Sequence, residues 1–223
     1  MDTLYILFLF AYVPSLAILW YFYSKDRLEP EPKRYVAMTF VYGAVVSIGI
    51  AIFLEKILQE IFQDTIPPVL AISLFSAIVE EPSKALAIRF PYDAGQMDGV
   101  MDGVVYGVAA GLGFAATENF LYGIGFGVEV TLFRVLLIPI GHGAWTSITG
   151  VGYGLKSEGK VGSVVPFLLI AIVFHFSWNY LVIISSEFYP YMLFLVIVFL
   201  LNIGILRYFV SLGYKEDVEK FGG

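Results

Sequence analysis

The 223-residue sequence contains no cysteine and only two histidines, His142 and His175. The absence of cysteine excludes disulfide bonds and thiolate zinc sites, so any metal ion must be held by carboxylates and imidazoles. Charged residues are also scarce: Asp, Glu, Lys and Arg make up 14% of the chain, whereas soluble domains contain about 25%. Few side chains are therefore left that can carry chemistry.

Apolar sequence dominates the chain instead. Hydrophobic residues make up 59% of it, and the mean hydropathy is +0.82. Uncharged stretches of about 20 residues, the length of a helix that crosses a bilayer, follow one another with short polar connections. They predict an all-α polytopic membrane protein, a single domain over residues 1–223 with a bundle of about seven transmembrane helices. The expected spans are residues 3–24, 35–54, 66–90, 99–125, 131–155, 161–185 and 188–206.

Positive charges are distributed unevenly between the two sides of these spans. Of the 13 Lys and Arg residues, only Lys56 and Arg134 fall on the side opposite to the rest. By the positive-inside rule, the amino terminus lies outside and the carboxyl terminus lies in the cytoplasm of a cell membrane. The net charge of -6 argues against a nucleic-acid partner. The lipid bilayer and membrane proteins are the expected partners.

Ionisable residues interrupt the span over residues 66–90. Glu80, Glu81 and Lys84 lie in its middle, where a charged side chain is costly enough to mark a functional site by default. Pro82 cannot donate a hydrogen bond to the carbonyl of Ile78, so we expect it to kink the helix beside the glutamates. Kinked helices at this depth are tolerated where they line a polar cavity.

The span over residues 99–125 has a face of small residues. These recur every four positions at Gly99, Gly103, Gly107, Gly111 and Ala115. Such a face allows two helix backbones to approach closely in lipid. Glu118 projects from nearly the same face, so we expect protein to enclose it. Asp98 and Asp102 are expected to cap the start of this helix, where free N–H groups and the helix dipole favour carboxylates.

Residues four apart share a helix face, and this spacing pairs His142 with Thr146 and His175 with Asn179. A rise of 1.5 Å per residue places Glu80, Glu118 and both histidines about 10 to 20 Å from the outer ends of their helices. The sequence therefore predicts an intramembrane polar cavity with a catalytic core over residues 66–185. Taken singly, a membrane histidine is more often a hydrogen-bonded helix contact, and Glu80 with Lys84 can be a structural ion pair.

The motifs resemble the PrsW family of intramembrane proteases. The resemblance rests on Glu80-Glu81-x-x-Lys84, the Asp98-to-Gly107 segment, Phe114-x-x-x-Glu118-Asn119, His142, and His175-x-x-x-Asn179. It extends more distantly to the group that contains the CAAX prenyl endoproteases. Glu118 stands where that wider group has a histidine, so its assignments do not transfer directly. The family resemblance implies endoproteolysis of a membrane protein, in the prototype a single-span anti-sigma factor cut on the outer side.

Peptide hydrolysis requires an activated water, a base and a donor to the oxyanion. Glu80 suits the base, because its close neighbour Glu81 makes ionisation of both carboxyls unfavourable. Lys84 can hold Glu81 charged, the two histidines can orient or bind the water, and Asn179 can donate to the oxyanion.

Two mechanisms stay open at this point: a zinc ion held by Glu118, His142 and His175, and a metal-free glutamate mechanism. Two further classes also accommodate these residues. A proton- or cation-coupled transporter would use the same acids and histidines as an ion path. A non-catalytic membrane chaperone would tolerate the loss of Glu80 or His175.

Overall fold

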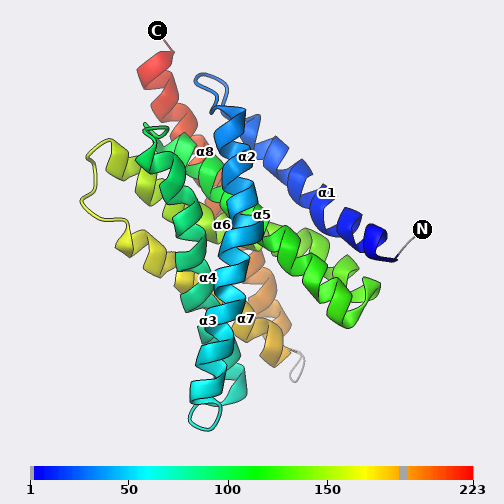
Figure 1. Cartoon of the computed structure of the whole chain (residues 1–223). Coiled ribbons are helices and arrows are strands. Elements are labelled where there is room, and N and C mark those ends of the chain that lie inside the picture. Colours follow the sequence, from blue (N-terminus) through cyan, green and yellow to red (C-terminus); the bar gives the residue numbers. More distant parts are fainter. Residues whose placement is uncertain (1–2, 186–189, 223) are drawn as a thin grey trace.

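The computed structural model describes residues 3–185 and 190–222, and every regular element in this part of the chain is helical (Figure 1). The elements are α1 (Thr3–Tyr23), α2 (Lys33–Tyr42), the π-helical segment η1 (Gly43–Ser47), α3 (Ile48–Phe62), α4 (Pro68–Asp93), α5 (Val100–Phe126), α6 (Val128–Ser157), α7 (Val165–Ser185) and α8 (Tyr191–Phe221). Because α2, η1 and α3 follow one another without a break, residues 3–185 and 190–222 form seven continuous helical segments, here called rods. The last expected span begins at Phe188, which lies outside the described residues.

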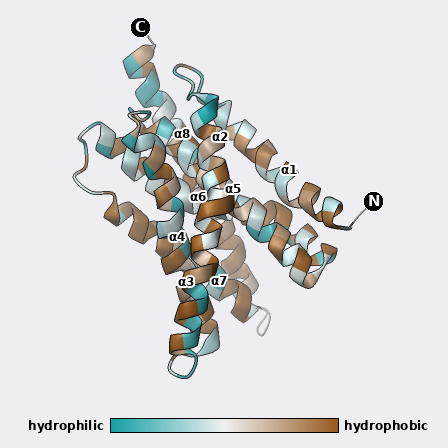
Figure 2. Cartoon of the chain, in the orientation of Figure 1, coloured by the Kyte–Doolittle hydropathy of each residue, from teal (hydrophilic) through white to brown (hydrophobic). Residues whose placement is uncertain are grey.

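Six of these rods are long and apolar enough to cross a membrane. Brown, apolar residues cover much of their surface in Figure 2, and large side chains such as Phe126 and Phe133 are 70% and 81% exposed. Exposed apolar surface of this extent suits contact with lipid. The seventh rod, α4, is 26 residues long but carries Glu80, Glu81 and Lys84. The predicted class, an all-α multi-pass membrane protein, is confirmed.

Helix α5 lies at the centre of the bundle, and its residues are buried almost without interruption from Val100 to Ala116. Its glycine face packs against α6, as the four-residue spacing predicts. A Cβ atom at Gly107 would lie 2.6 Å from Cα of Ser147, and one at Gly103 would lie 2.7 Å from the carbonyl carbon of Gly150. Gly111 faces the backbone carbonyl of His142. The glycines therefore place a candidate site residue of α6 directly against α5.

We expect Gly107→Ala to destabilise the folded protein by about 1 to 3 kcal/mol, because its Cβ would overlap the backbone of α6. The matched control is Gly204→Ala, since nothing lies within 4 Å of a Cβ at this position of α8. There the better helix propensity of alanine should stabilise by up to about 1 kcal/mol. Thermal unfolding of both variants in detergent measures the difference. Equal effects at the two positions would contradict the close packing of α5 and α6.

The π-helical segment η1 connects the second rod to α5. The backbone carbonyl of Ala44 accepts a hydrogen bond from Thr117 Oγ1 at 2.7 Å, and Thr117 Oγ1 lies 2.8 Å from the hydroxyl of Tyr12. One side chain of α5 thus ties α1 and η1 to the central helix. Segments of π-helix often occur beside functional sites, and here α3 continues from η1 toward the site described below. Helix α4, in contrast, runs through Pro82 as one continuous helix.

The start of α5 is capped differently from the expectation. Asp102 does accept a hydrogen bond, from the backbone N–H of Asp98 at 2.6 Å. The N–H of Val100, however, donates to Glu216 of α8 at 2.7 Å. The side chain of Asp98 instead lies 4.0 Å from Nζ of Lys220. The prediction that Asp98 caps this helix is therefore wrong, because the carboxylate of Glu216 in α8 accepts the hydrogen bond from the free N–H of Val100.

The loop between α1 and α2 lies against this same end of α5. Its residues Asp26 and Glu31 are only 4% and 3% exposed. Burial raises the pKa of Asp26 to about 7, and burial together with nearby Asp102 raises the pKa of Glu31 to about 10. The hydroxyl of Tyr106 donates to Glu31, and the N–H of Glu31 donates to Asp26 at 2.9 Å. A carboxyl that keeps its proton can remain buried beside a second acid without charge repulsion. The hydrogen bond between Tyr106 and Glu31 therefore holds this loop against α5.

Candidate active site

Helix α4 presents a fully buried lysine to two glutamates and a histidine. Nζ of Lys84 lies 2.7 Å from Glu81 Oε1, 3.2 Å from Glu80 Oε2 and 2.8 Å from His142 Nδ1. It also lies 4.3 Å from the ring centre of Phe114. The ammonium thus has hydrogen-bond acceptors in Glu81 and His142, the carboxylate of Glu80 as a third close neighbour, and an aromatic face beside it. This arrangement explains how a lysine is accommodated at 0% exposure.

The two adjacent glutamates point in different directions. Glu81 is fully buried and accepts hydrogen bonds from Lys84, from Thr146 Oγ1 at 3.3 Å and from His175 Nδ1 at 2.9 Å. Thr146 was expected to assist His142, but its hydroxyl donates a hydrogen bond to Glu81 instead. Glu80 lines a cavity, where its Oε2 atom has no hydrogen bond of good geometry despite the 3.2 Å approach of Lys84.

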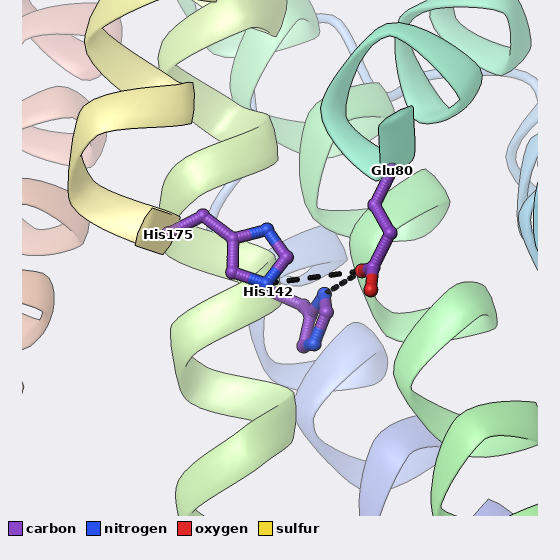
Figure 3. A group of neighbouring side chains, drawn as sticks. All are labelled: Glu80, His142 and His175. Atoms are coloured by element: carbon purple, nitrogen blue, oxygen red, sulfur yellow. Dashed lines mark ion pairs between the residues drawn. The ribbon is translucent and has the colours of Figure 1, made fainter. Parts of the chain in front are cut away.

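Glu80 faces both histidines. Figure 3 shows its carboxylate beside the two rings, with Oε2 at 4.0 Å from His142 Nδ1 and at 3.8 Å from His175 Nε2. Because His175 Nδ1 contacts Glu81, that nitrogen carries the proton and Nε2 presents a lone pair toward Glu80. One ligand atom from each of Glu80, His142 and His175 lies within 4.8 Å of the others, a spacing that can hold a metal ion.

Aromatic side chains fix the orientation of the two imidazoles. The ring of Trp145 stacks on His175 with centroids 4.4 Å apart, and its Nε1 donates to Asn202 of α8 at 3.1 Å. The ring of Phe114 stacks on His142 at 5.4 Å. Trp145 lies three residues after His142 in α6, so one helix supplies a histidine and also the support for the other histidine. This support did not emerge from the sequence, because stacking depends on how α6 and α7 pack.

The cavity beside Glu80 has a volume of about 390 Å³ and receives side chains from α3, α4, α5, α6 and α7. Glu118, His142 and Asn179 line it, as expected from their helix positions. Glu55 of α3 also lines it and lies beside the Glu80 carboxyl. The sequence suggested no site role for Glu55. The rod that carries it extends past the expected end of its span, to Phe62, and so brings this carboxylate to the cavity.

Glu118 lies on the other side of His142. Its Oε2 is 3.3 Å from His142 Nε2 and 2.9 Å from Arg134, whose Nε donates to Asn119 at 3.0 Å. The guanidinium of Arg134 also lies over the ring of Tyr122, 3.7 Å from its centre. The expected zinc ligands were Glu118, His142 and His175. The group that the structure brings within ligand spacing has Glu80 in place of Glu118.

Comparison with known proteins gives the chemistry of this cavity a context. The family of PrsW intramembrane metalloproteases matches residues 31–203, a range that includes each residue described at the cavity. The chain belongs to the PrsW family. It is thus a membrane-embedded protease, and its substrates are membrane proteins within a lipid bilayer.

Several PrsW proteases resemble the chain over most of their length. Protease PrsW of Bacillus subtilis is 30% identical over 186 residues, which cover 81% of this chain and 84% of the relative. That of Shouchella clausii is 26% identical over 209 residues, or 90% and 93% of the two chains. That of Geobacillus kaustophilus is 32% identical over 142 residues, 63% of this chain and 62% of the relative. No solved structure matches the chain.

Proposed function

We propose that this PrsW protease hydrolyses a peptide bond of a membrane-protein substrate inside the Glu80 cavity, using a metal ion held by Glu80, His142 and His175. One observation carries the proposal: a buried carboxylate oxygen without a hydrogen bond of good geometry lies at about 4 Å from a nitrogen of each of two imidazoles. His142 Nδ1 accepts a hydrogen bond from Lys84 at 2.8 Å, and a metal ion at this nitrogen would take the place of the ammonium. One carboxylate and two imidazoles are the ligand set of many zinc peptidases.

The charges at the cavity also suit a divalent cation. Among the described residues, the carboxylates of Glu55, Glu80, Glu81 and Glu118 have two cations beside them, Lys84 and Arg134. A bound zinc ion would allow all four carboxyls to be ionised, because its two charges would balance the two carboxylates that these cations leave without a partner. When bound, zinc would polarise the scissile carbonyl and lower the pKa of a bound water.

The remaining side chains have distinct roles in this proposal. Glu81 positions His175 through its Nδ1–H, an outer contact that commonly orients a ligand histidine. Glu118 lines the cavity with a charge maintained by Arg134, and it takes the proton from the attacking water. Asn179 lies one turn beyond His175 and donates to the developing oxyanion.

The position of the cavity supports cleavage near the outer side of the membrane. Its lining comes from the end of the bundle that carries the α3–α4 and α5–α6 connections. The Lys and Arg asymmetry assigns this end to the outer side and the carboxyl terminus to the cytoplasm. We propose a substrate with a single membrane span, of the anti-sigma-factor type, because a cavity open between helices admits one unfolded segment at a time.

The experiment compares metal content and peptidase activity in a matched pair of variants. Glu80→Gln should lose both bound zinc and cleavage of a membrane peptide, whereas Glu118→Gln should keep zinc and lose cleavage. The opposite pattern would assign Glu118 as the ligand and Glu80 as the base, the arrangement expected from the sequence. Full activity of the wild-type protein after chelation and dialysis, with no metal detected, would refute the metal site. Ion flux in liposomes without any cleavage would refute the protease assignment at this cavity.

A further inference from the structure

Helices α1 and α8 leave a second hollow between them, away from the Glu80 cavity. It has a volume of about 850 Å³, within the range of sites that hold organic ligands. Ile140 of α6 contributes to its lining, and the walls come from one face of each helix. We call this hollow the α1–α8 groove.

The lining of the α1–α8 groove gains polar residues toward one end. Toward the middle of the bundle it consists of apolar residues such as Ala17, Ile18 and Ile203. Farther along both helices polar residues join the lining, with Phe22, Leu206 and Val210 still among them: Tyr21 and Lys25 on α1 and in the turn after it, and Arg207, Ser211 and Tyr214 on α8. The carboxyl-terminal ends of α1 and α8 lie at the same end of the molecule in Figure 1, and the polar residues near both ends line the same hollow.

The two cations in this groove lack acidic partners. Neither Lys25 nor Arg207 forms an ion pair with another residue in the described part of the chain, although Lys25 lies over the ring of Tyr21 at 4.4 Å. The neighbouring acid Asp26 is directed elsewhere, toward the backbone N–H of Glu31. Arg207 lies 16 residues into α8, or about 24 Å along the helix, near the boundary of a hydrocarbon core about 30 Å thick. Two unpaired cations at this boundary attract an anion from the membrane interface.

We propose that the α1–α8 groove binds one anionic phospholipid, with its phosphate between Lys25 and Arg207 and an acyl chain along the apolar part. The two cations at one end of the groove suit the anionic headgroup of such a lipid, and the apolar lining suits its tail. Basic pockets between transmembrane helices are known to hold anionic headgroups in this manner. The hydroxyls of Tyr21, Ser211 and Tyr214 supply further donors at the phosphate end.

Native mass spectrometry of the purified full-length chain tests this proposal. The protein is exchanged into micelles that contain equal amounts of phosphatidylglycerol and phosphatidylcholine, and the retained lipid is identified. The wild-type protein should retain one phosphatidylglycerol per chain in clear preference. Lys25→Gln with Arg207→Gln should weaken this retention about 25-fold, since each interfacial cation contributes roughly fivefold.

Two control variants separate a built site from general attraction. Arg27→Gln with Lys215→Gln removes the same charge from exposed positions outside the groove and should leave retention unchanged. Ala17→Trp keeps both cations but fills the apolar part, so it should abolish retention. Equal retention of both lipids, or an equal loss in the charge-matched control, would overturn the proposal. Unchanged membrane-peptide cleavage shows that each variant is folded.

Discussion

Replacing His175 with phenylalanine is expected to lower cleavage of a membrane peptide at least about a thousandfold, a loss of roughly 4 kcal/mol of transition-state stabilisation. The imidazole places Nε2 toward Glu80, and no atom of phenylalanine can bind a metal ion or a water there. Phenylalanine retains an aromatic ring for the stack on Trp145, so the packing between α6 and α7 should persist. Initial rates with a fluorogenic transmembrane peptide in detergent provide the measurement.

The same assay distinguishes a positioning role from a direct one. Glu81→Gln keeps a side chain of the same shape next to His175. It weakens the hydrogen bond that this side chain accepts from the Nδ1–H of His175. Loss of such an outer contact usually reduces metal affinity or activity by about 10- to 100-fold. Added zinc should partly restore Glu81→Gln, whereas it should not restore the phenylalanine variant. An active His175→Phe enzyme would remove this histidine from the mechanism.

Replacing Lys84 with methionine is expected to destabilise the folded protein by about 3 to 5 kcal/mol. Removal of one partner from a buried ion pair leaves the other charge uncompensated, and here two carboxylates lose the same ammonium. Methionine has a similar length and preserves contact with the ring of Phe114. The transition midpoint in a denaturant titration of the purified protein measures the change.

Two further variants test whether the loss of stability arises from the ion pair between Lys84 and Glu81. Lys56→Met removes an exposed cation that has no ion pair in the described part of the chain, so it should change stability by less than about 0.5 kcal/mol. Adding Glu81→Gln to Lys84→Met should recover part of the loss, because a neutral amide no longer needs a counterion. Additive losses in the double variant would show that Lys84 does not act through Glu81.

The sequence predicted those features that depend on one helix at a time. Apolar length identified the rods, and the four-residue repeat of Gly103, Gly107 and Gly111 identified a close helix contact. Helical rise placed Glu80, Glu118 and His142 at similar depth, and all three line one cavity. Local periodicity is sufficient for such statements, because a helix fixes the relative direction and height of its own side chains.

Features that depend on two helices could not be predicted in this way. The partner of the glycine face is α6, which presents Gly150, Ser147 and the backbone of His142. Nothing in the spacing showed that Thr146 donates to Glu81, or that Glu80 rather than Glu118 has nitrogens of both histidines within ligand spacing. These outcomes depend on helix rotation and register, which tertiary packing determines.

The contact between α5 and α6 restricts how the substrate range of this protease can change. Gly111 contacts the backbone of His142, and Glu118 lies two turns farther along α5, so these two helices cannot move apart without separating reactive groups. The opposite walls of the cavity have more freedom. Ile52 of α3 and Val182 of α7 line it with exposed apolar side chains. Selection for new cleavage sequences should therefore change residues of α3 and α7. The packing of α5 against α6 should stay the same.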